Sequence, residues 1–393
     1  MPSLPKVILK PQKEKPVLAQ HPWIFSGAIK NVEGSFDTGD LVSVYNHAGQ
    51  FLAKGYINPD SQIRVRLLTF RDEEINADFF RKKIETALLL RKEWVPAETN
   101  AFRLIHSEGD FIPGLIVDQY ADFLVVQFLT AGIEQLKDPI VQVLADVVKP
   151  KGIFEKDDSD ARAFEGLPER LALLYGDAPP EFIAIQENGM KFSVNVHAGQ
   201  KTGFFLDQRE SRKRVMEHSK GKRVLNCFAY TGGFSVYAAK GGAKEVVSVE
   251  ISKDALSVCE KNMKLNGFDG PNFQYHTEDV FDFLRKPQEP YDLIILDPPA
   301  FAPNRNAVMQ ASRGYKDINM NALKLLKPGG LLFTYSCSHH IDPVLFQQIL
   351  FGAAKDAGVR VQILEKISNP PDHPVSIYHP EGEYLKGVIL RNC

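Results

Sequence analysis

The sequence predicts an α/β protein whose C-terminal half folds as a parallel sheet covered by helices on both faces. From Ile185 onward, apolar runs of strand length alternate with segments of helical periodicity, which is the pattern of βαβ units. The first 72 residues instead contain short β-type runs separated by turn residues. A chain of 393 residues is too long for one ordinary core. We therefore expect three domains, spanning residues 1–72, 73–180 and 181–393.

The first predicted domain is a small β-barrel or sandwich. Its charge is weakly positive, with nine Lys and Arg against six acidic residues, for a sum of +3. Such an excess fits either an ordinary solvated surface or contact with RNA, and both remain open here. The β-type runs are Gly39–Tyr45, Phe51–Ile57 and Ile63–Leu68.

The second predicted domain is of the α+β type. Helical periodicity covers Asn76–Trp94 and Pro139–Val148, whereas Ile112–Val117 and Phe123–Leu129 have the composition of strands. The acidic run Asp157–Asp160 lacks the regular ligand spacing of a metal site, so we interpret it as a solvated loop. Outside this domain, the pair His339-His340 likewise has no third ligand nearby in the sequence, so we predict that the protein binds no metal.

The third predicted domain contains the parallel sheet. Ligands on such sheets bind at the carboxyl ends of the strands, so residues at those ends are the candidates for function. Predicted strands are Val224–Cys227, Glu245–Glu250, Phe273–His276, Leu293–Asp297 and Leu331–Tyr335, and predicted helices are Phe234–Lys240, Lys253–Asn266 and Met320–Leu326.

The composition limits the cellular compartment in which the protein can work and the kinds of partner that it can bind. The net charge of −2 excludes a wholly basic nucleic-acid coat protein, although it allows a local basic face. The four cysteines form no CxxC pair, which favours a reducing compartment. The Lys- and Pro-rich N-terminus lacks the apolar region of a secretory signal, and no apolar stretch has the length of a membrane span. We expect a cytoplasmic protein with no membrane association, and a homodimer is left open.

A strand, a glycine-rich turn and a helix follow one another over residues 226–235. Gly232 and Gly233 let the backbone approach a ligand closely, and Glu250, 18 positions after Gly232, can accept hydrogen bonds from two ribose hydroxyls. The turn is not G-x-G-x-x-G, so it provides no pyrophosphate site. This favours S-adenosylmethionine over a nicotinamide dinucleotide. The candidate cofactor residues are Phe228, Tyr230, Thr231, Gly232, Gly233, Glu250, Ile251, Asp279, Val280 and Asp297.

Two strand ends indicate the reacting centre. The segment Asp297-Pro298-Pro299-Ala300-Phe301 can hold a planar base through Asp297 and the Pro298 carbonyl, while Phe301 stacks on it. Cys337 follows the next strand of the sheet. A lone cysteine is usually a small buried hydrophobe, but its place at a strand end favours a nucleophile.

A thiol is needed when the methylated atom is C5 of a pyrimidine. Addition of the thiolate to C6 makes C5 nucleophilic, and Asp297 can hydrogen-bond the protonated ring N3 of cytosine. The base must leave its stack to reach such a pocket. Methylation of an exocyclic amine, such as guanine N2, would use Asp297 and Pro298 without Cys337. An oxidoreductase and a non-catalytic RNA-binding protein are more distant alternatives.

Basic residues near these motifs are ambiguous. Arg313 and Lys316 could hold a phosphate or belong to a surface cluster at the start of a helix. Residues 209–223 include seven Lys and Arg, which form either an RNA-binding patch or a solvated helix face.

At these residues the sequence resembles the bacterial 23S ribosomal RNA cytosine-5 methyltransferases that have an N-terminal PUA domain. The resemblance covers nearly the whole chain. It implies a PUA-like β-barrel, a central α+β domain and a Rossmann-like class I methyltransferase domain. It also implies S-adenosylmethionine as cofactor, bordered by Asp207 and Arg209, ribosomal RNA as partner, and Cys337 as nucleophile. The matching segments are residues 21–27, 107–118, 200–209, 226–235, 297–301, 313–319 and 336–338.

Overall fold

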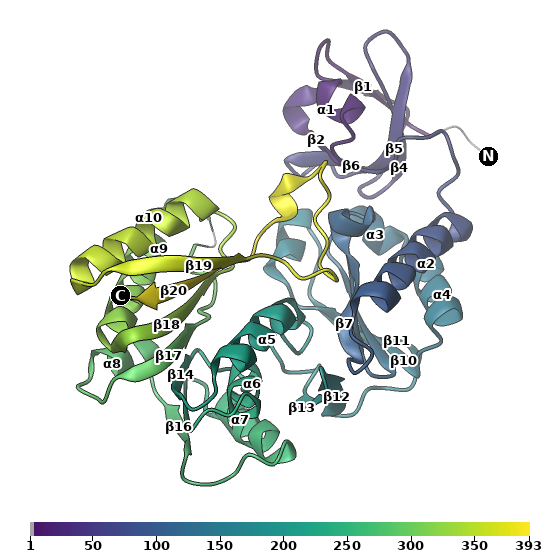
Figure 1. The fold of residues 1–393 in the computed structure, drawn as a ribbon. Helices are drawn as coiled ribbons and strands as arrows, with labels where there is room; N and C mark the ends of the chain where they lie inside the picture. The colour runs from purple at the N-terminus through teal and green to yellow at the C-terminus, as the bar shows by residue number, and fades with distance from the viewer. Residues whose placement is uncertain (1–3, 303) are drawn as a thin grey trace. The chain divides into compact units, whose positions relative to one another are not determined.

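The computed structural model describes residues 4–302 and 304–393, and they divide into two compact units (Figure 1). Of the described residues, unit 1 comprises 4–188, 194–206 and 371–382, and unit 2 comprises 189–193, 207–302, 304–370 and 383–393. Each unit therefore contains segments that are distant in the sequence. The strands β12 (Ile183–Glu187) and β13 (Met190–Val194) form a separate two-stranded sheet.

The first sheet of unit 1 has six strands in the order β2-β6-β5-β4-β1-β3. Only the β1–β4 pair is parallel. The buried faces of these strands form one apolar cluster with the helix α1 (Lys15–Leu18). The prediction located the last three strands to within two residues, but it missed the first three, which are short. The strands are β1 (Lys6–Leu9), β2 (Trp23–Phe25), β3 (Ile29–Glu33), β4 (Leu41–Tyr45), β5 (Phe51–Ile57) and β6 (Ile63–Thr69).

The second sheet of unit 1 has five strands in the order β11-β10-β9-β8-β7, against which α2 and α4 pack. The side chain of Asn76 accepts a hydrogen bond from Phe79 N and caps α2, so the helix begins where its predicted segment begins. The elements are α2 (Ala77–Trp94), β7 (Ala101–His106), β8 (Leu115–Tyr120), β9 (Phe123–Phe128), α3 (Ala131–Gln135), α4 (Lys137–Val148), β10 (Gly152–Asp157) and β11 (Arg170–Gly176).

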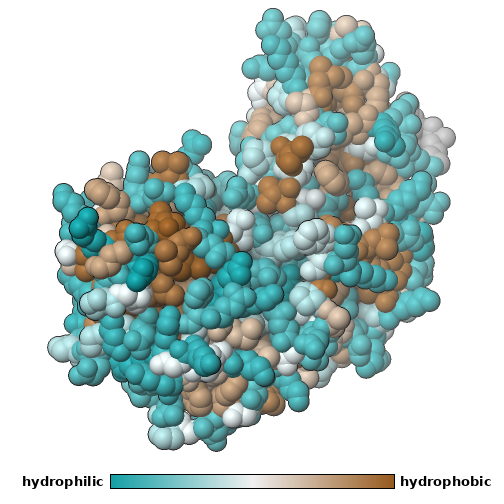
Figure 2. All heavy atoms as spheres, in the orientation of Figure 1, coloured by the Kyte–Doolittle hydropathy of each residue, from teal (hydrophilic) through white to brown (hydrophobic). Residues whose placement is uncertain are grey.

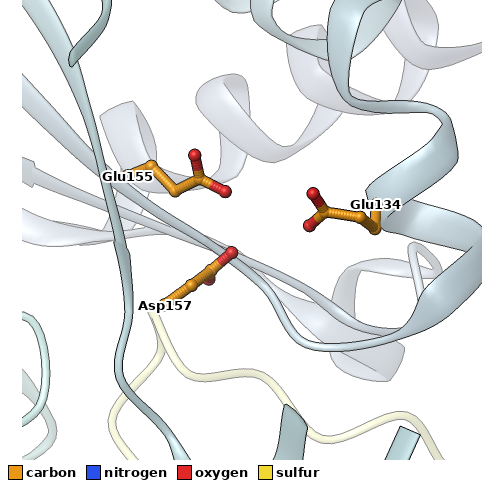
Figure 3. A group of neighbouring side chains, drawn as sticks. All are labelled: Glu134, Glu155 and Asp157. Atoms are coloured by element: carbon orange, nitrogen blue, oxygen red, sulfur yellow. The ribbon is translucent and has the colours of Figure 1, made fainter. Parts of the chain in front are cut away.

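Three carboxylates gather beside β10 in unit 1 (Figure 3). Oxygens of Glu134, Glu155 and Asp157 lie within 4.8 Å of one another. Lys137 contacts both glutamates, and Arg162 Nη1 lies 2.6 Å from Asp157 Oδ2. The prediction of a solvated loop was therefore wrong at Asp157, because β10 continues through this residue and buries it completely. The two cations compensate the acidic charge, and we interpret the group as a buried ion-pair network.

Unit 2 is built on a seven-stranded sheet in the order β16-β15-β14-β17-β18-β20-β19. Numbered along the chain, these strands have the order 3-2-1-4-5-7-6. The first five are mutually parallel, and β20 runs antiparallel to both of its neighbours. The strand order reverses between β14 and β17, so the crevice at their carboxyl ends is where a ligand would bind. The strands are β14 (Arg223–Cys227), β15 (Glu245–Glu250), β16 (Phe273–Thr277), β17 (Tyr291–Leu296), β18 (Leu326–Ser336), β19 (Val361–Ile367) and β20 (Lys386–Asn392).

Helices cover both faces of this sheet, as the sequence predicted (Figure 1). One face holds α8, α9 and α10 over the main apolar core, and the other holds α5, α6 and α7. The predicted helix over Met320–Leu326 overlaps only the end of α9, because polar residues and Gly314 interrupt the apolar period upstream. The helices are α5 (Arg209–His218), α6 (Gly233–Lys240), α7 (Lys253–Leu265), α8 (Val280–Arg285), α9 (Val308–Lys324) and α10 (Pro343–Ala357).

Within the described part of the chain, no helix combines the length and the apolar character needed to span a bilayer. Figure 2 shows hydrophobic residues gathering on the visible face of unit 2 near β19 and α10. Large side chains exposed on these two elements include Phe351, Ile363 and Leu364.

Candidate active site

The turn between β14 and α6 has an unusual backbone. Phe228 and Tyr230 adopt positive φ angles of 58° and 46°, which bulky residues rarely do. Gly232 also has a positive φ of 84°, and a Cβ at this position would lie 2.4 Å from Cys259 Sγ on α7. Glycine is thus required here by its backbone angle and by packing within the protein, in addition to any ligand.

The carboxylate of Glu250 is held rigidly at the end of β15. Its Oε2 accepts a hydrogen bond from Tyr230 N at 2.9 Å, and its Oε1 accepts one from Ser252 N at 3.0 Å. The neighbouring side chain of Ile251 is 68% exposed, which is unusual for so apolar a residue. A fixed carboxylate beside an exposed apolar surface fits a ribose and its attached base.

Asp279 lies after β16 and caps the following helix. Its Oδ1 accepts hydrogen bonds from Phe281 N at 2.7 Å and from Asp282 N at 3.3 Å. Val280 is buried at the start of α8. The two residues thus have structural roles that the sequence analysis did not foresee, and the role of Asp279 in cofactor binding stays a prediction.

The segment that leads into α5 contributes to the same strand ends. Gln208 Nε2 donates to Asp297 Oδ1 at 2.8 Å, and Tyr384 OH donates to Asp207 Oδ2 at 2.7 Å. Asp207 is buried, as is Arg209, the first residue of α5. This segment therefore positions Asp297 directly, through a residue that the sequence analysis did not single out.

The idea that residues 209–223 form one RNA-binding patch or one solvated face was wrong for two of its arginines. Arg209 and Arg212 are 0% and 2% exposed, respectively. Arg209 Nε lies 3.2 Å from Glu210 Oε1. Burial of these guanidinium groups means that α5 presents fewer cations to solvent than its sequence suggests.

The Asp-Pro-Pro loop and Cys337 meet at the ends of the adjacent strands β17 and β18. Cys337 Sγ lies 3.9 Å from the carbonyl oxygen of Pro298, and the Cys337 side chain is partly exposed. Asp297 is the residue after β17, and its side chain is half-buried. Asp297 and Cys337, the two predicted reactive residues, therefore lie at the same edge of the sheet.

Ser338 ties the Cys337 loop to three other elements. Its Oγ lies 2.9 Å from Tyr315 OH on α9 and accepts a hydrogen bond from Ala302 N at 3.2 Å. Its carbonyl oxygen accepts a hydrogen bond from Lys386 Nζ at 2.7 Å. These contacts restrict the position of Cys337.

Lys386 is a candidate functional residue that the sequence analysis missed. Lys386 is only 6% exposed, and it lies opposite Ser336 in the antiparallel pairing of β18 with β20. Burial lowers the pKa of Lys386 to about 8, against the opposing effect of negative charge on Cys337, Glu383 and Asp342. One sequence feature could have revealed Lys386. It directly precedes the apolar run Gly387–Leu390, which is an unusual place for a charged residue unless it is paired.

The remaining predicted substrate residues are more dispersed. The Phe301 ring packs on Tyr315, with ring centroids 4.7 Å apart, so part of its surface belongs to the core. Arg313 is exposed on α9. Lys316 Nζ lies 2.5 Å from Asp356 Oδ2 on α10, which makes a structural ion pair its visible role. Base stacking by Phe301 and phosphate binding by Arg313 or Lys316 stay predictions.

Comparisons with known proteins match this architecture. Residues 168–389 match the family of S-adenosylmethionine-dependent methyltransferases, and residues 7–70 match the PUA-like domain. A proposed S-adenosylmethionine-dependent methyltransferase from Streptococcus mutans gives a TM-score of 0.85 at 27% identity, over 98% of this chain and 99% of that one. A crystal structure of a proposed methyltransferase complexed with SAH gives a TM-score of 0.86 at 28% identity, with the same coverage. The fold and the site thus define an S-adenosylmethionine-dependent methyltransferase with a PUA-like domain.

Curated relatives specify the family. Ribosomal RNA large subunit methyltransferase I of Aeromonas hydrophila is 47% identical over 385 residues, which cover 96% of this chain and 97% of that protein. The protein of the same name from Tolumonas auensis is 44% identical over 391 residues, which cover 98% of each chain. The chain therefore belongs to the ribosomal RNA large subunit methyltransferase I family, and its cofactor is S-adenosylmethionine.

Proposed function

We propose that this protein methylates C5 of a cytosine in large-subunit ribosomal RNA. The observation that supports this most directly is the 3.9 Å separation between Cys337 Sγ and the Pro298 carbonyl oxygen. It puts a thiol beside a loop suited to holding a planar base. The names of the curated relatives support ribosomal RNA as the substrate.

The cofactor residues divide according to the parts of the nucleoside. Glu250 would accept hydrogen bonds from the ribose hydroxyls, while Ile251, Asp279 and Val280 would contact the adenine. When bound, S-adenosylmethionine supplies an electrophilic methyl group. The other residues proposed to border it are Phe228, Tyr230, Thr231, Gly232, Gly233, Asp207, Arg209 and Asp297.

The proposed chemistry begins with the cytosine turned out of its stack. The Cys337 thiolate forms a bond to C6, and its electron pair makes C5 nucleophilic, so that C5 can take the methyl group. As the adduct forms, N3 takes up a proton from water, which it returns when the thiolate leaves, and Asp297 accepts a hydrogen bond from this N3–H group. Loss of the C5 proton to a base then expels the thiolate and restores the aromatic ring. Lys386, buried beside the Cys337 loop, stabilises the thiolate before addition and after expulsion.

A second candidate function is methylation of an exocyclic amine such as guanine N2. The observation that favours it is the Asp297-Pro298 pair, because a carboxylate and a carbonyl can both accept hydrogen bonds from an amino group. In that reaction Cys337 would only pack against the loop.

Methyl transfer to ribosomal RNA by wild type, Cys337→Ala and Cys393→Ala distinguishes the two candidates. Cys393 is exposed at the end of the chain, so its substitution is a matched control. We expect 5-methylcytosine from wild type and from the control, and a loss of activity in Cys337→Ala of at least about a thousandfold. Activity of Cys337→Ala near the wild-type level, or a methyl group on an exocyclic amine, would contradict the thiol mechanism.

A further inference from the structure

A cavity of about 520 Å³ lies in unit 1. Its volume is in the range of sites that bind small molecules. The end of β6, the start of α2, the loop around Phe111 and the segment 371–382 all contribute to its wall. The residues used below are Arg71, Phe79, Lys82, Lys83, Glu108 and Phe111.

Phe111 is in a strained conformation at this cavity. Its φ of 60° and ψ of 28° place it in the left-handed region, which is unfavourable for a residue with a Cβ. Its side chain is nevertheless 54% exposed, so packing of the ring offers little compensation. A bulky aromatic residue that is both strained and exposed indicates a role other than stability.

Lys83 Nζ lies over this ring, 5.7 Å from its centre, and two further cations line the same cavity. Lys83 Nζ donates to the Phe111 carbonyl oxygen at 3.0 Å and lies 4.9 Å from the centre of the Phe79 ring. Lys82 and Arg71 are exposed at the same wall. Phe111 and these cations therefore combine an aromatic face with positive charge, the pair of features that binds single-stranded RNA through base stacking and phosphate contact.

Two acids, Glu73 and Glu108, also line the wall, and Glu108 is held in place by hydrogen bonds within the protein. Glu108 Oε1 accepts a hydrogen bond from Trp23 Nε1 at 2.8 Å, and its Oε2 accepts one from Ser107 Oγ at 2.6 Å. A carboxylate fixed in this way can accept a further hydrogen bond from a base amino group or a ribose hydroxyl. An acidic ligand without such donors would fit less well.

We propose that this cavity binds one unstacked nucleotide of a single-stranded RNA segment, with its base on Phe111 and its phosphate near Lys82 and Lys83. The inference rests on the proposed function in taking RNA as the substrate. It assigns a recognition site to unit 1 that is separate from the reacting cytosine.

Equilibrium binding of a short fluorescein-labelled single-stranded RNA of mixed sequence, followed by fluorescence anisotropy, tests this site. Phe111→Gly removes the ring and relieves the backbone strain. We expect affinity to fall about fivefold to a hundredfold while the melting temperature stays the same or rises. A merely structural role would instead lower the melting temperature. Phe111→Tyr should retain most of the affinity.

Phe164→Ala is the matched control, because Phe164 is 81% exposed in unit 1 and lies outside the cavity wall. It should leave the affinity unchanged. Lys82→Gln should reduce the slope of log K against log salt by about 0.7, the value for one lost contact to a single-strand phosphate.

Wild-type RNA affinity in Phe111→Gly, or an equal loss in Phe164→Ala, would overturn the proposal. A defect of Phe111→Gly seen only with assembled ribosomal particles, and not with RNA alone, would overturn it in favour of a protein partner. Because these measurements follow binding, they are independent of which nucleoside is methylated. Failure of the cytosine-5 proposal would appear in the nucleoside analysis and would leave this result intact.

Discussion

At the scale of single residues, the candidate site combines two groups that were predicted from the sequence with one that was not. Asp297 and Cys337 could be predicted because each follows a clear apolar strand, and parallel strands end at the same edge of the sheet. Lys386 could not, because β20 enters the sheet antiparallel, from the end of the chain. Its place beside the Cys337 loop depends on that late strand.

Lys386 should control the reactivity of Cys337. A buried cation stabilises a thiolate, so we expect Cys337 to react with iodoacetamide with an apparent pKa below the usual value of about 8.5. In Lys386→Met that pKa should rise by about one unit, which lowers the rate at neutral pH about tenfold. Lys386→Arg should keep most of the effect. The pH dependence of alkylation, resolved by peptide mass spectrometry, measures each thiol separately.

The exposed thiol of Cys393 provides an internal reference for this experiment. Its profile should be the same in all variants. Glu383, Asp342 and Tyr315 are among the other titratable groups near the pair, and none of them is altered in these variants. Two outcomes would show that Lys386 does not act on the thiol. In one, the alkylation of wild-type Cys337 has the same pH dependence as that of Cys393. In the other, the pH dependence of Cys337 alkylation is unchanged in Lys386→Met.

At the scale of elements, the parallel strands were predicted well because buried strands are continuous apolar runs. Among the helices of unit 2, only α6 and α7 were located over their whole length. The predicted bounds of β5 and β15 agree with the structure at both ends. Short or largely exposed strands, such as β2 and β11 respectively, were missed. Their exposed side chains give no alternating pattern from which to infer a strand.

Gly232 offers a test of why the cofactor turn needs glycine. Gly232→Ala should lower the free energy of unfolding of unit 2, because the new Cβ would meet Cys259 and the positive φ would be strained. Gly221 has a φ of 70° with nothing within 4 Å of an added Cβ, so Gly221→Ala isolates the backbone strain.

We expect a loss of about 1–2 kcal/mol in Gly221→Ala and a further loss of about 1–3 kcal/mol in Gly232→Ala from the steric clash. Urea unfolding followed by circular dichroism would measure both. Equal losses in the two variants would show that α7 yields to the new methyl group.

At the scale of the whole molecule, the sequence predicted the order of the fold classes but not the path of the chain. The predicted boundaries near residues 72 and 180 stay predictions, since the two compact units are defined by contacts and not by continuous segments. Residues 371–382 belong to unit 1 although strands of unit 2 flank them on both sides. No local pattern could show this, because the assignment depends on tertiary contacts.

The two units contain different intrinsic probes. Both tryptophans, Trp23 and Trp94, lie in unit 1, and all four cysteines lie in unit 2. Burial raises the pKa of Cys259 to about 12, and Cys227 is also fully buried, so both thiols should react only when unit 2 unfolds. Tryptophan fluorescence and the alkylation of Cys227 and Cys259 along a urea series would then report the two units separately. Appreciable alkylation of either thiol in native protein would contradict this.

Residues 371–382, the last segment of unit 1, also affect when unit 1 can finish folding during synthesis of the chain. Asp372 is buried there, where its carbonyl accepts a hydrogen bond from Arg91 at 2.9 Å and its Oδ2 accepts one from Arg103 N at 3.2 Å. Arg91 is itself fully buried. Translation must therefore continue for nearly three hundred residues after Arg91 before these partners exist. A nascent N-terminal half would wait on the ribosome with these two hydrogen bonds unmade, and its final consolidation would follow the synthesis of residues 371–382.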